Sequence, residues 1–319
     1  MKNNFFLILA DKRRETVQKA VKINDKTLRI SKKNMSGLSA DIVTYVMLLA
    51  LSVIFIVPFL YILSKSLMSA EDLVDTNVQW IPRKLIFENY TFAFMVLSYI
   101  PRLIRSVSVA GVSVLGQVLS CSFVAYGIAR MKFKGRGIIF SLVIFAMLIP
   151  PQAIIVTQYL EFAKLRMLDT FWPIILPCFF SLGLNGGLFV FLFHQFFKAM
   201  PKELEDAALI DGTGIFGAFF RVVFPNSGAT ILVTSILSFI WQWNNYFEPG
   251  IYITIRDKYT LSMMLPALGS ESVSMNMSSG FNNGTWLAAT CLCVLPVIII
   301  FFILQKRFIK GIETTGLAN

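Results

Sequence analysis

The chain has 319 residues, of which 56% are hydrophobic and 15% are charged, whereas about a quarter of an ordinary soluble domain is charged. Thirty phenylalanines and several long stretches without charge indicate a protein embedded in lipid rather than a soluble one. The net charge of +11 does not indicate nucleic-acid binding, because the basic residues gather in alternate loops between the uncharged stretches.

Six stretches of the chain contain no charged residue. A helix needs about 20 apolar residues to cross the hydrocarbon core of a bilayer, and each stretch is long enough. They are residues 42–64, 106–129, 137–160, 170–197, 222–247 and 272–305, the last span being expected near 285–305. The sequence therefore predicts an all-α polytopic membrane protein with six transmembrane helices.

The loops between these spans differ in their content of basic residues. Twenty lysines and arginines lie on the side of the N-terminus, and nine lie in the other loops. Because cytoplasmic loops carry the excess of basic residues, we expect both termini to be cytoplasmic. Residues 1–40 hold ten of the twenty and form a basic extension, which either attracts anionic lipid or only fixes the topology.

Two features precede the middle of the chain. Residues 89–101 are uncharged but too short to span a bilayer, so we expect an amphipathic helix on the outer surface. The second stretch, 106–129, places Ser113, Gln117 and Ser120 on one helical face. Such residues either bond neighbouring helices or line a path, and bonding is the favoured interpretation.

Prolines and glycines interrupt the third and fourth stretches. Pro150 and Pro151 stand in the middle of 137–160 and predict a kinked helix that faces the protein interior, where its freed backbone groups can be satisfied. In the fourth stretch, residues 183–187 read Gly-Leu-Asn-Gly-Gly, with Asn185 between glycines spaced for close helix approach.

The fifth stretch ends in Trp-Gln-Trp-Asn-Asn-Tyr at 241–246. Aromatic side chains gather at the membrane interface, which is the favoured interpretation. Amides interleaved with aromatic rings also suit a sugar, whose hydroxyl groups need hydrogen bonds and whose C–H faces stack on rings. The candidates for a solute path are Gln117, Asn185, Trp241, Trp243, Asn244 and Asn245.

An acidic segment, residues 201–212, lies between the fourth and fifth stretches on the cytoplasmic side. Pro201 suits the first turn of a helix, Gly212 supplies its end, and Thr213 can cap the helix that follows. We expect a helical hairpin that serves as a docking surface. Its carboxylates are Glu203, Glu205, Asp206 and Asp211.

Several kinds of chemistry are missing from the sequence. It contains no phosphate-binding loop, no serine-hydrolase elbow and no zinc-protease motif, and His194 is its only histidine. We therefore expect no catalytic residue, no metal site and no cofactor. The predicted spans also hold no carboxylate or basic residue at depth, which argues against an ion-coupled secondary carrier. The remaining interpretation is a membrane protein that forms a transport path and takes its energy from a partner.

The hairpin carries a family motif. Asp206-Ala207-Ala208, then Gly212 after three residues, and Val222-Val223-Phe224-Pro225 after nine more, resemble the EAA loop of ABC importer permeases. The flanking residues resemble the carbohydrate branch, such as the second membrane subunit of the maltose transporter. So do Pro150-Pro151, Trp243-Asn244 and Gln305…Phe308…Gly311. The resemblance covers about 40–319. Asp206 replaces the family glutamate, and Glu205 beside it could share the role.

The resemblance implies a permease domain over 41–319, with the hairpin at about 201–221, in the bacterial plasma membrane. It implies as partners a second permease, two cytoplasmic ATPases that hydrolyse ATP, an extracytoplasmic solute-binding protein and membrane lipid. The solute would be a sugar or oligosaccharide; an amino acid, a polyamine or a glycerol-phosphate-like compound is the alternative. The residues expected to couple to the ATPase are Glu203, Glu205, Asp206, Ala207, Ala208, Asp211 and Gly212.

Overall fold

A computed structural model of the protein describes residues 41–274 and 282–316, and these residues form helices and no strands. The basic extension 1–40 lies outside the described residues. The chain divides into two compact units, Met1–Ile62 and Leu63–Asn319. The first helix, Asp41–Ser66, holds the described part of the first unit, and it is long and apolar enough to cross a membrane. This confirms the position of the first predicted span.

The second unit begins with two short helices, α2 (Ala70–Val74) and α3 (Glu88–Val96). Helix α3 falls where a surface helix was expected, but it packs against α15 (Asn283–Gly316) within the unit. The Nδ2 atom of its buried Asn89 donates to the backbone oxygens of Ser66 and Met68, both at 2.9 Å. Helix α3 is therefore joined to neighbouring segments of the protein along this face.

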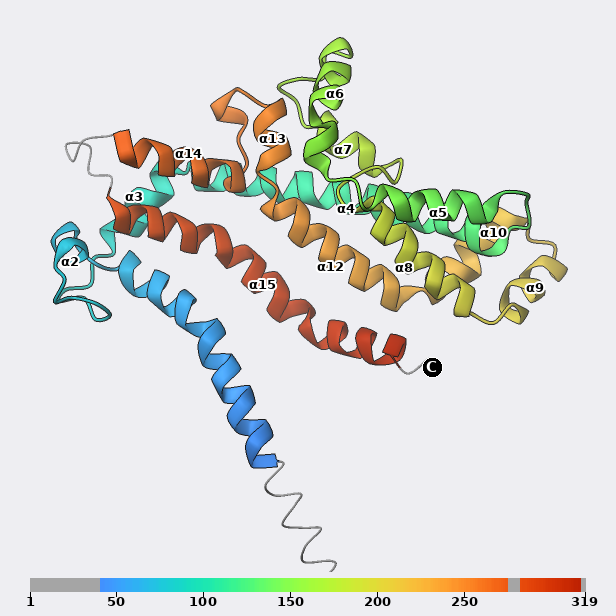
Figure 1. Cartoon of the computed structure of the whole chain (residues 1–319), viewed down its shortest axis with the longest axis horizontal. Helices are drawn as coiled ribbons and strands as arrows, with labels where there is room; N and C mark the ends of the chain where they lie inside the picture. The colour runs from blue at the N-terminus through green and yellow to red at the C-terminus, as the bar shows by residue number, and fades with distance from the viewer. Residues whose placement is uncertain (1–40, 275–281, 317–319) are drawn as a thin grey trace, which may run out of the picture. The chain divides into compact units, whose positions relative to one another are not determined.

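Helix α4 (Tyr99–Arg130) runs unbroken for 32 residues through the second unit. It packs against α7, α8 and α12 (Gly228–Asn244), and α12 in turn packs against α15 (Figure 1). Helices α4 and α15 coincide with the second and sixth predicted spans, and both are long and apolar enough to cross a membrane.

The third predicted span is broken rather than kinked. Helix α5 (Arg136–Ala146) and helix α6 (Pro151–Lys164) meet at an angle of 99°. Pro150 is in an extended conformation and Pro151 is the first residue of α6, where its missing N–H costs nothing. The two prolines therefore end one helix and start another.

The fourth predicted span, 170–197, is not one helix. It comprises α7 (Trp172–Cys178) and α8 (Gly186–Ala199), which are separated by a turn in which Ser181 and Asn185 have positive φ angles of 60° and 58°. A Cβ on Gly186 would lie 2.2 Å from the Ser181 oxygen, so this turn requires glycine. The expectation of close packing holds at Gly187, where a Cβ would lie 2.7 Å from the Met147 side chain.

Short elements lie between α12 and α15: α13 (Phe247–Tyr252), the 3₁₀ turn Arg256–Lys258 and α14 (Leu261–Ser274). Within the described residues, three helices can cross a membrane by length and composition. Two bent pairs, α5–α6 and Ile215–Asn226 with α12, could each form a further span. The six-span count therefore remains a prediction.

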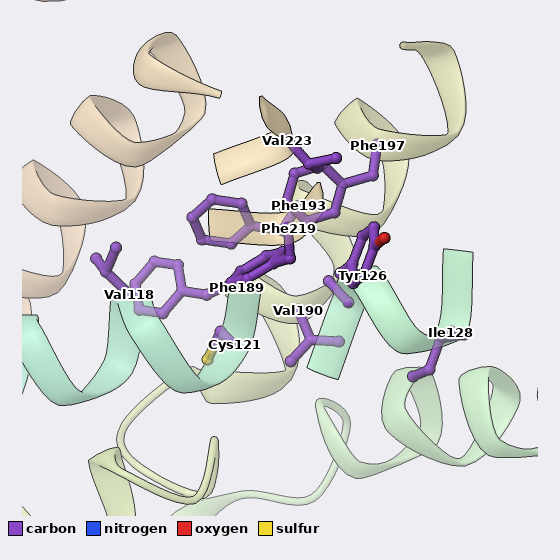
Figure 2. Packing of buried hydrophobic residues seen from close by; sticks show 11 residues of the cluster. Val118, Cys121, Tyr126, Ile128, Phe189, Val190, Phe193, Phe197, Phe219 and Val223 are labelled. Carbon is purple, nitrogen blue, oxygen red and sulfur yellow. The ribbon is translucent and has the colours of Figure 1, made fainter. Parts of the chain in front are cut away.

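An aromatic core lies within the second unit, next to the acidic segment. Buried side chains from α4, α8 and the π-helical segment Phe219–Val223 pack together (Figure 2). The cluster is built around Tyr126, Phe189, Phe193, Phe197, Phe219 and Val223. Because aromatic side chains bury large areas and prefer tilted or edge-on contacts, such a cluster fixes the relative position of its helices.

Candidate coupling hairpin and solute path

The acidic segment forms the predicted helix–turn–helix. Helix α9 (Glu203–Ile210) is followed by a turn, α10 (Ile215–Ala218), the π-helical segment and α11 (Phe224–Asn226). Gly212 has a φ of +82°, a left-handed conformation that glycine adopts without strain and that ends α9 as predicted.

Two details of the hairpin differ from expectation. Pro201 lies before α9, whose N-cap residue is Lys202. The Thr213 hydroxyl donates back to the Ala208 carbonyl oxygen, so it closes α9 and does not cap α10, which starts at the N-cap Gly214. The negative charge in the first turn is where the helix dipole favours it.

The side chains of α9 separate onto two faces. Glu205 is half-buried and Ala208, three residues later, is buried, so both face the protein. The other face is open to solvent, and Ile210 on it is 85% exposed. The remaining predicted coupling residues are exposed: Glu203, Asp206, Ala207, Asp211 and Gly212.

Glu205 is bonded within the chain. Its Oε1 atom accepts a hydrogen bond from the Tyr126 hydroxyl at 2.6 Å, and its Oε2 atom lies 3.6 Å from the Arg130 Nε. The sequence left open which carboxylate faces a partner. Because Glu205 is engaged by α4, Asp206 is the exposed carboxylate of the motif. Sequence reasoning missed Tyr126 and Arg130, because no local pattern joins α4 to a residue about 80 positions later.

The second arm of the hairpin is anchored by packing. Phe219 and Val223 are almost fully buried in the aromatic core, and the Phe219 ring lies 5.1 Å from that of Tyr126. Both arms therefore rest on the same end of α4, one through polar bonds and one through apolar contact.

Gln117 and its neighbours bond other helices. The fully buried Gln117 donates from Nε2 to the Leu184 oxygen at 2.7 Å and accepts at Oε1 from the Ser238 hydroxyl at 2.9 Å. Ser120 donates to the Cys178 oxygen at 2.7 Å and accepts from the Ser181 N–H at 3.1 Å. These bonds confirm the bonding interpretation for Gln117 and Ser120, and they satisfy backbone groups of the turn between α7 and α8.

The other path candidates do not form one surface. Trp243 is buried and its Nε1 donates to the Cys293 oxygen at 3.3 Å, while Trp241 packs on Phe189. Asn185 is exposed at the start of α8, and Asn244 is exposed and bonds its own helix. Their role toward a solute stays a prediction.

A polar pocket lies where α7 and α12 meet α6 and α13. Its accessible space is about 30 Å³, room for one or two water molecules, and it is lined in part by Gln158, Gln242, Glu248 and Tyr252. Gln242 is buried and its Oε1 has no hydrogen-bond partner among the described residues. Asn245, one of the path candidates, donates to Glu248 at 3.0 Å. Burial raises the pKa of the Glu248 carboxyl. Gln242, a third amide of the 241–246 stretch, was the signal that could have identified this pocket.

Among the described residues, no group of three His, Cys, Asp or Glu side chains is placed to hold a metal ion. His194 is buried and stacks on Phe140 with ring centroids 3.9 Å apart.

Residues 118–314, most of the chain, match the family described as binding-protein-dependent transport system inner membrane component. The chain belongs to this family. It is therefore an integral membrane permease subunit of an ABC transporter, and the resemblance seen in the hairpin motif is confirmed.

Similar proteins extend over nearly the same length. The arabinooligosaccharides transport system permease protein AraQ of Bacillus subtilis is 31% identical over 83% of this chain and 92% of its own. The probable starch degradation products transport system permease protein AmyC of Thermoanaerobacterium thermosulfurigenes is 29% identical, with 83% and 92% covered. The lactose transport system permease protein LacG of Rhizobium radiobacter is 26% identical, with 85% and 94% covered.

A solved structure has the same fold. It is a chain in the crystal structure of a bacterial ABC transporter involved in the import of the acidic polysaccharide alginate. The TM-score is 0.70 over 84% of this chain and 95% of that chain, with 21% sequence identity. At this identity, the likeness establishes the fold alone.

Proposed function

We propose that this permease subunit imports a sugar or oligosaccharide and takes its energy from a separate cytoplasmic ATPase that docks on the hairpin. The observation that carries the docking is the two-faced helix α9. Its inner face is held by the protein, and its outer face leaves Asp206, Ala207 and Ile210 exposed. A small residue between an acidic and a large apolar one allows close approach of a partner and gives it a charge and a contact to recognise.

The choice of solute is supported by the similar proteins. AraQ, AmyC and LacG are named for transport of arabinooligosaccharides, starch degradation products and lactose. The proposal includes the wider arrangement implied by the family: a second permease, two ATPases and an extracytoplasmic binding protein, with this chain forming half of the path. It also includes six spans over 41–319, cytoplasmic termini and a bacterial inner-membrane location.

The polar groups that line this small pocket support a hydroxyl-rich solute in this subunit, while the space between them holds only one or two water molecules. Two amides, a carboxylate and a phenol converge on it from Gln158, Gln242, Glu248 and Tyr252. A convergent set of a few polar groups in a cavity is the usual form of a small-molecule site. Asn245, one of the path candidates, is joined to this set through its bond to Glu248.

The solute is tested with the complete transporter reconstituted in vesicles with its binding protein. Arabinotriose, maltotriose and lactose are compared with an amino acid, spermidine and glycerol 3-phosphate for stimulation of ATP hydrolysis and for uptake. We expect stimulation by at least one sugar and by no other solute. Stimulation by spermidine, glycerol 3-phosphate or the amino acid alone would overturn the sugar assignment.

Docking is tested by Ala207→Asp, which places a bulky charge on the exposed face of α9. We expect the ATPase no longer to co-purify with the membrane subunits, because the new side chain blocks close approach, and uptake to be lost. Ala199→Asp, at an exposed alanine in the last turn of α8, is the matched control and should retain both. Normal co-purification and uptake by Ala207→Asp would contradict the docking role.

A further inference from the structure

We propose that Tyr126, Arg130 and Glu205 form a latch through which movement of α9 reaches α4. The proposal rests on the proposed function of the hairpin as the docking surface for an ATPase. It assigns Glu205 a positioning role inside this chain, whereas Asp206 beside it is left for the partner. Tyr126 and Arg130 become residues of the coupling machinery although neither lies in the hairpin.

Tyr126 and Arg130 hold the carboxylate of Glu205 between them, and we call this arrangement the clamp. Tyr126 and Arg130 are four residues apart near the end of α4, so they project from the same face of that helix. The Tyr126 hydroxyl donates to Oε1 at 2.6 Å, a short bond typical of a charged acceptor. Arg130 Nε lies 3.6 Å from Oε2, which is an ion pair rather than a hydrogen bond.

Burial makes this clamp different from a surface ion pair. The Arg130 side chain is 4% exposed and that of Glu205 is 16% exposed. An exposed pair elsewhere in the protein, Lys164 with Glu161 at 3.3 Å, has side chains that are 73% and 60% exposed. Exposed pairs hold their partners weakly, whereas a buried charge that loses its partner is left uncompensated. Separation of α9 from α4 is therefore opposed.

Arg130 also joins a third element. Its Nη2 donates to the backbone oxygen of Met200 at 2.5 Å, and Met200 is the C-cap residue that follows α8. The Tyr126 ring packs in the aromatic core against Phe197 of α8 and Phe219 of the π-helical segment. One point near the end of α4 thus holds the end of α8 and both arms of the hairpin.

The latch supplies a rigid connection that the backbone does not. The turn after α9 contains Gly212 and Gly214, and glycine has more backbone freedom than any other residue. A displacement of α9 passed only through this turn would be absorbed there. Passed through Glu205, it acts on α4, which packs against α7, α8 and α12. Coupling requires such a physically connected element that both sites bias.

A purely structural brace is the competing explanation. A brace would maintain the hairpin, so its loss would lower the yield and thermal stability of the protein while leaving the solute moved per ATP unchanged. A latch determines that ratio. The deciding measurement is therefore solute transported per ATP hydrolysed, together with the response of α4 to nucleotide.

The principal variant is Tyr126→Phe in the assembled transporter, because it removes the hydroxyl and keeps the ring in the aromatic core. We expect unchanged co-purification of the ATPase and continued ATP hydrolysis. We expect solute moved per ATP to fall about tenfold, since one hydrogen bond to a charged group is lost. In Glu205→Gln, which keeps an acceptor for Tyr126 but leaves the buried Arg130 charge without its partner, solute moved per ATP should fall at least as far. The solute is the sugar that stimulates hydrolysis in the reconstitution above.

A second measurement does not depend on any solute. Hydrogen exchange is followed in the complex with and without ATP and vanadate. In the wild type, we expect nucleotide to change exchange in both 203–210 and the end of α4; in Tyr126→Phe, only in 203–210. Glu161→Gln breaks the exposed pair and is the control that should behave as wild type.

The possible results separate the two proposals. Wild-type transport per ATP and a wild-type response of α4 in Tyr126→Phe would overturn the latch. So would parallel losses of uptake and hydrolysis at a constant ratio, which indicate a brace. Normal docking and uptake by Ala207→Asp would instead contradict the hairpin's role as a docking surface, whatever the latch variants do.

Discussion

Helix α4 and the α7–α8 pair lie against each other, but one is continuous and the other is interrupted. Helix α4 keeps its own backbone hydrogen bonds for 32 residues, whereas the segment between α7 and α8 leaves helical geometry for seven, 179–185. In lipid, backbone groups outside a helix must find partners within the protein. Here, side chains of α4 provide several of them.

The dependence runs in one direction. Ser120 and Gln117 of α4 bond the backbone of Cys178, Ser181 and Leu184 around the break. The α7–α8 pair provides no comparable polar side chain to the backbone of α4 in the described residues. The comparison indicates that the interrupted segment is the fragile one and that its stability is set by residues of the intact helix.

The largest effect is expected for Gly186→Ala at the break. The added Cβ would lie 2.2 Å from the Ser181 oxygen, a backbone atom that cannot rotate away. We expect a loss of about 3 kcal/mol in stability, the upper part of the usual range for overpacking. Thermal unfolding in detergent measures it. Gly127→Ala on α4 has nothing within 4 Å and should be neutral or stabilising; equal losses in both variants would invalidate the comparison.

A smaller loss is expected for Gln117→Leu. Leucine has similar bulk, but it leaves the Leu184 oxygen and the Ser238 hydroxyl without their partner. Unpaired buried polar groups of this kind cost about 2 kcal/mol, and the effect should appear as faster proteolysis or exchange in 179–185. Gln195→Leu, at an exposed glutamine of α8, is the control. Unchanged exchange at the break in Gln117→Leu would show that the turn does not depend on α4.

The smallest effect concerns a loop outside the spans. Hydrogen bonds from the Thr254 N–H and hydroxyl, at 2.7 and 2.9 Å, lower the pKa of the Asp169 carboxyl. A carboxyl with a lowered folded-state pKa stabilises the protein above its unfolded pKa, near 4, and loses this contribution as pH falls through the folded value.

Asp169→Asn should therefore be slightly less stable than wild type at pH 7, and the two should converge as pH falls below about 4. Thermal unfolding across pH measures this. Asp257→Asn, at an exposed carboxylate three residues after Thr254, is the control. A difference that stays constant with pH would exclude the carboxylate as its cause.

The sequence predicted those features that depend on local composition. Continuous apolar length located the helices at 41–66, 99–130 and 283–306, and the hairpin followed from Gly212 and its acidic first turn. The proline pair marked the break between α5 and α6, although its sharpness exceeds a kink. The break within the fourth stretch was not predicted, because apolar composition outweighed Pro177 and the glycines at 183, 186 and 187, which together indicate a turn.

The site could be predicted only in part, for a physical reason. The motif identified the hairpin, but not which of its adjacent carboxylates faces outward. That depends on Tyr126 and Arg130, which reach Glu205 only after α4 and α9 are packed together. Trp243 and Gln117 read as path residues from their polarity and position, but tertiary packing buries them. Long-range pairing of single side chains leaves no periodic trace in a sequence.

The π-helical segment Phe219–Val223 belongs to a continuous helical run, residues 215–226, so the number of residues in this part of the motif determines where its side chains point. Each residue of an α-helix turns the chain by about 100°, and this run is helical without a break, so the number of residues between Phe219 and Val223 sets the direction in which Val223 points. Insertion or deletion of one residue there would not simply lengthen or shorten a connector. It would turn Val223 by roughly a quarter-turn relative to Phe219 and out of the aromatic core, so the nine residues between Gly212 and Val222 fix an orientation as well as a distance.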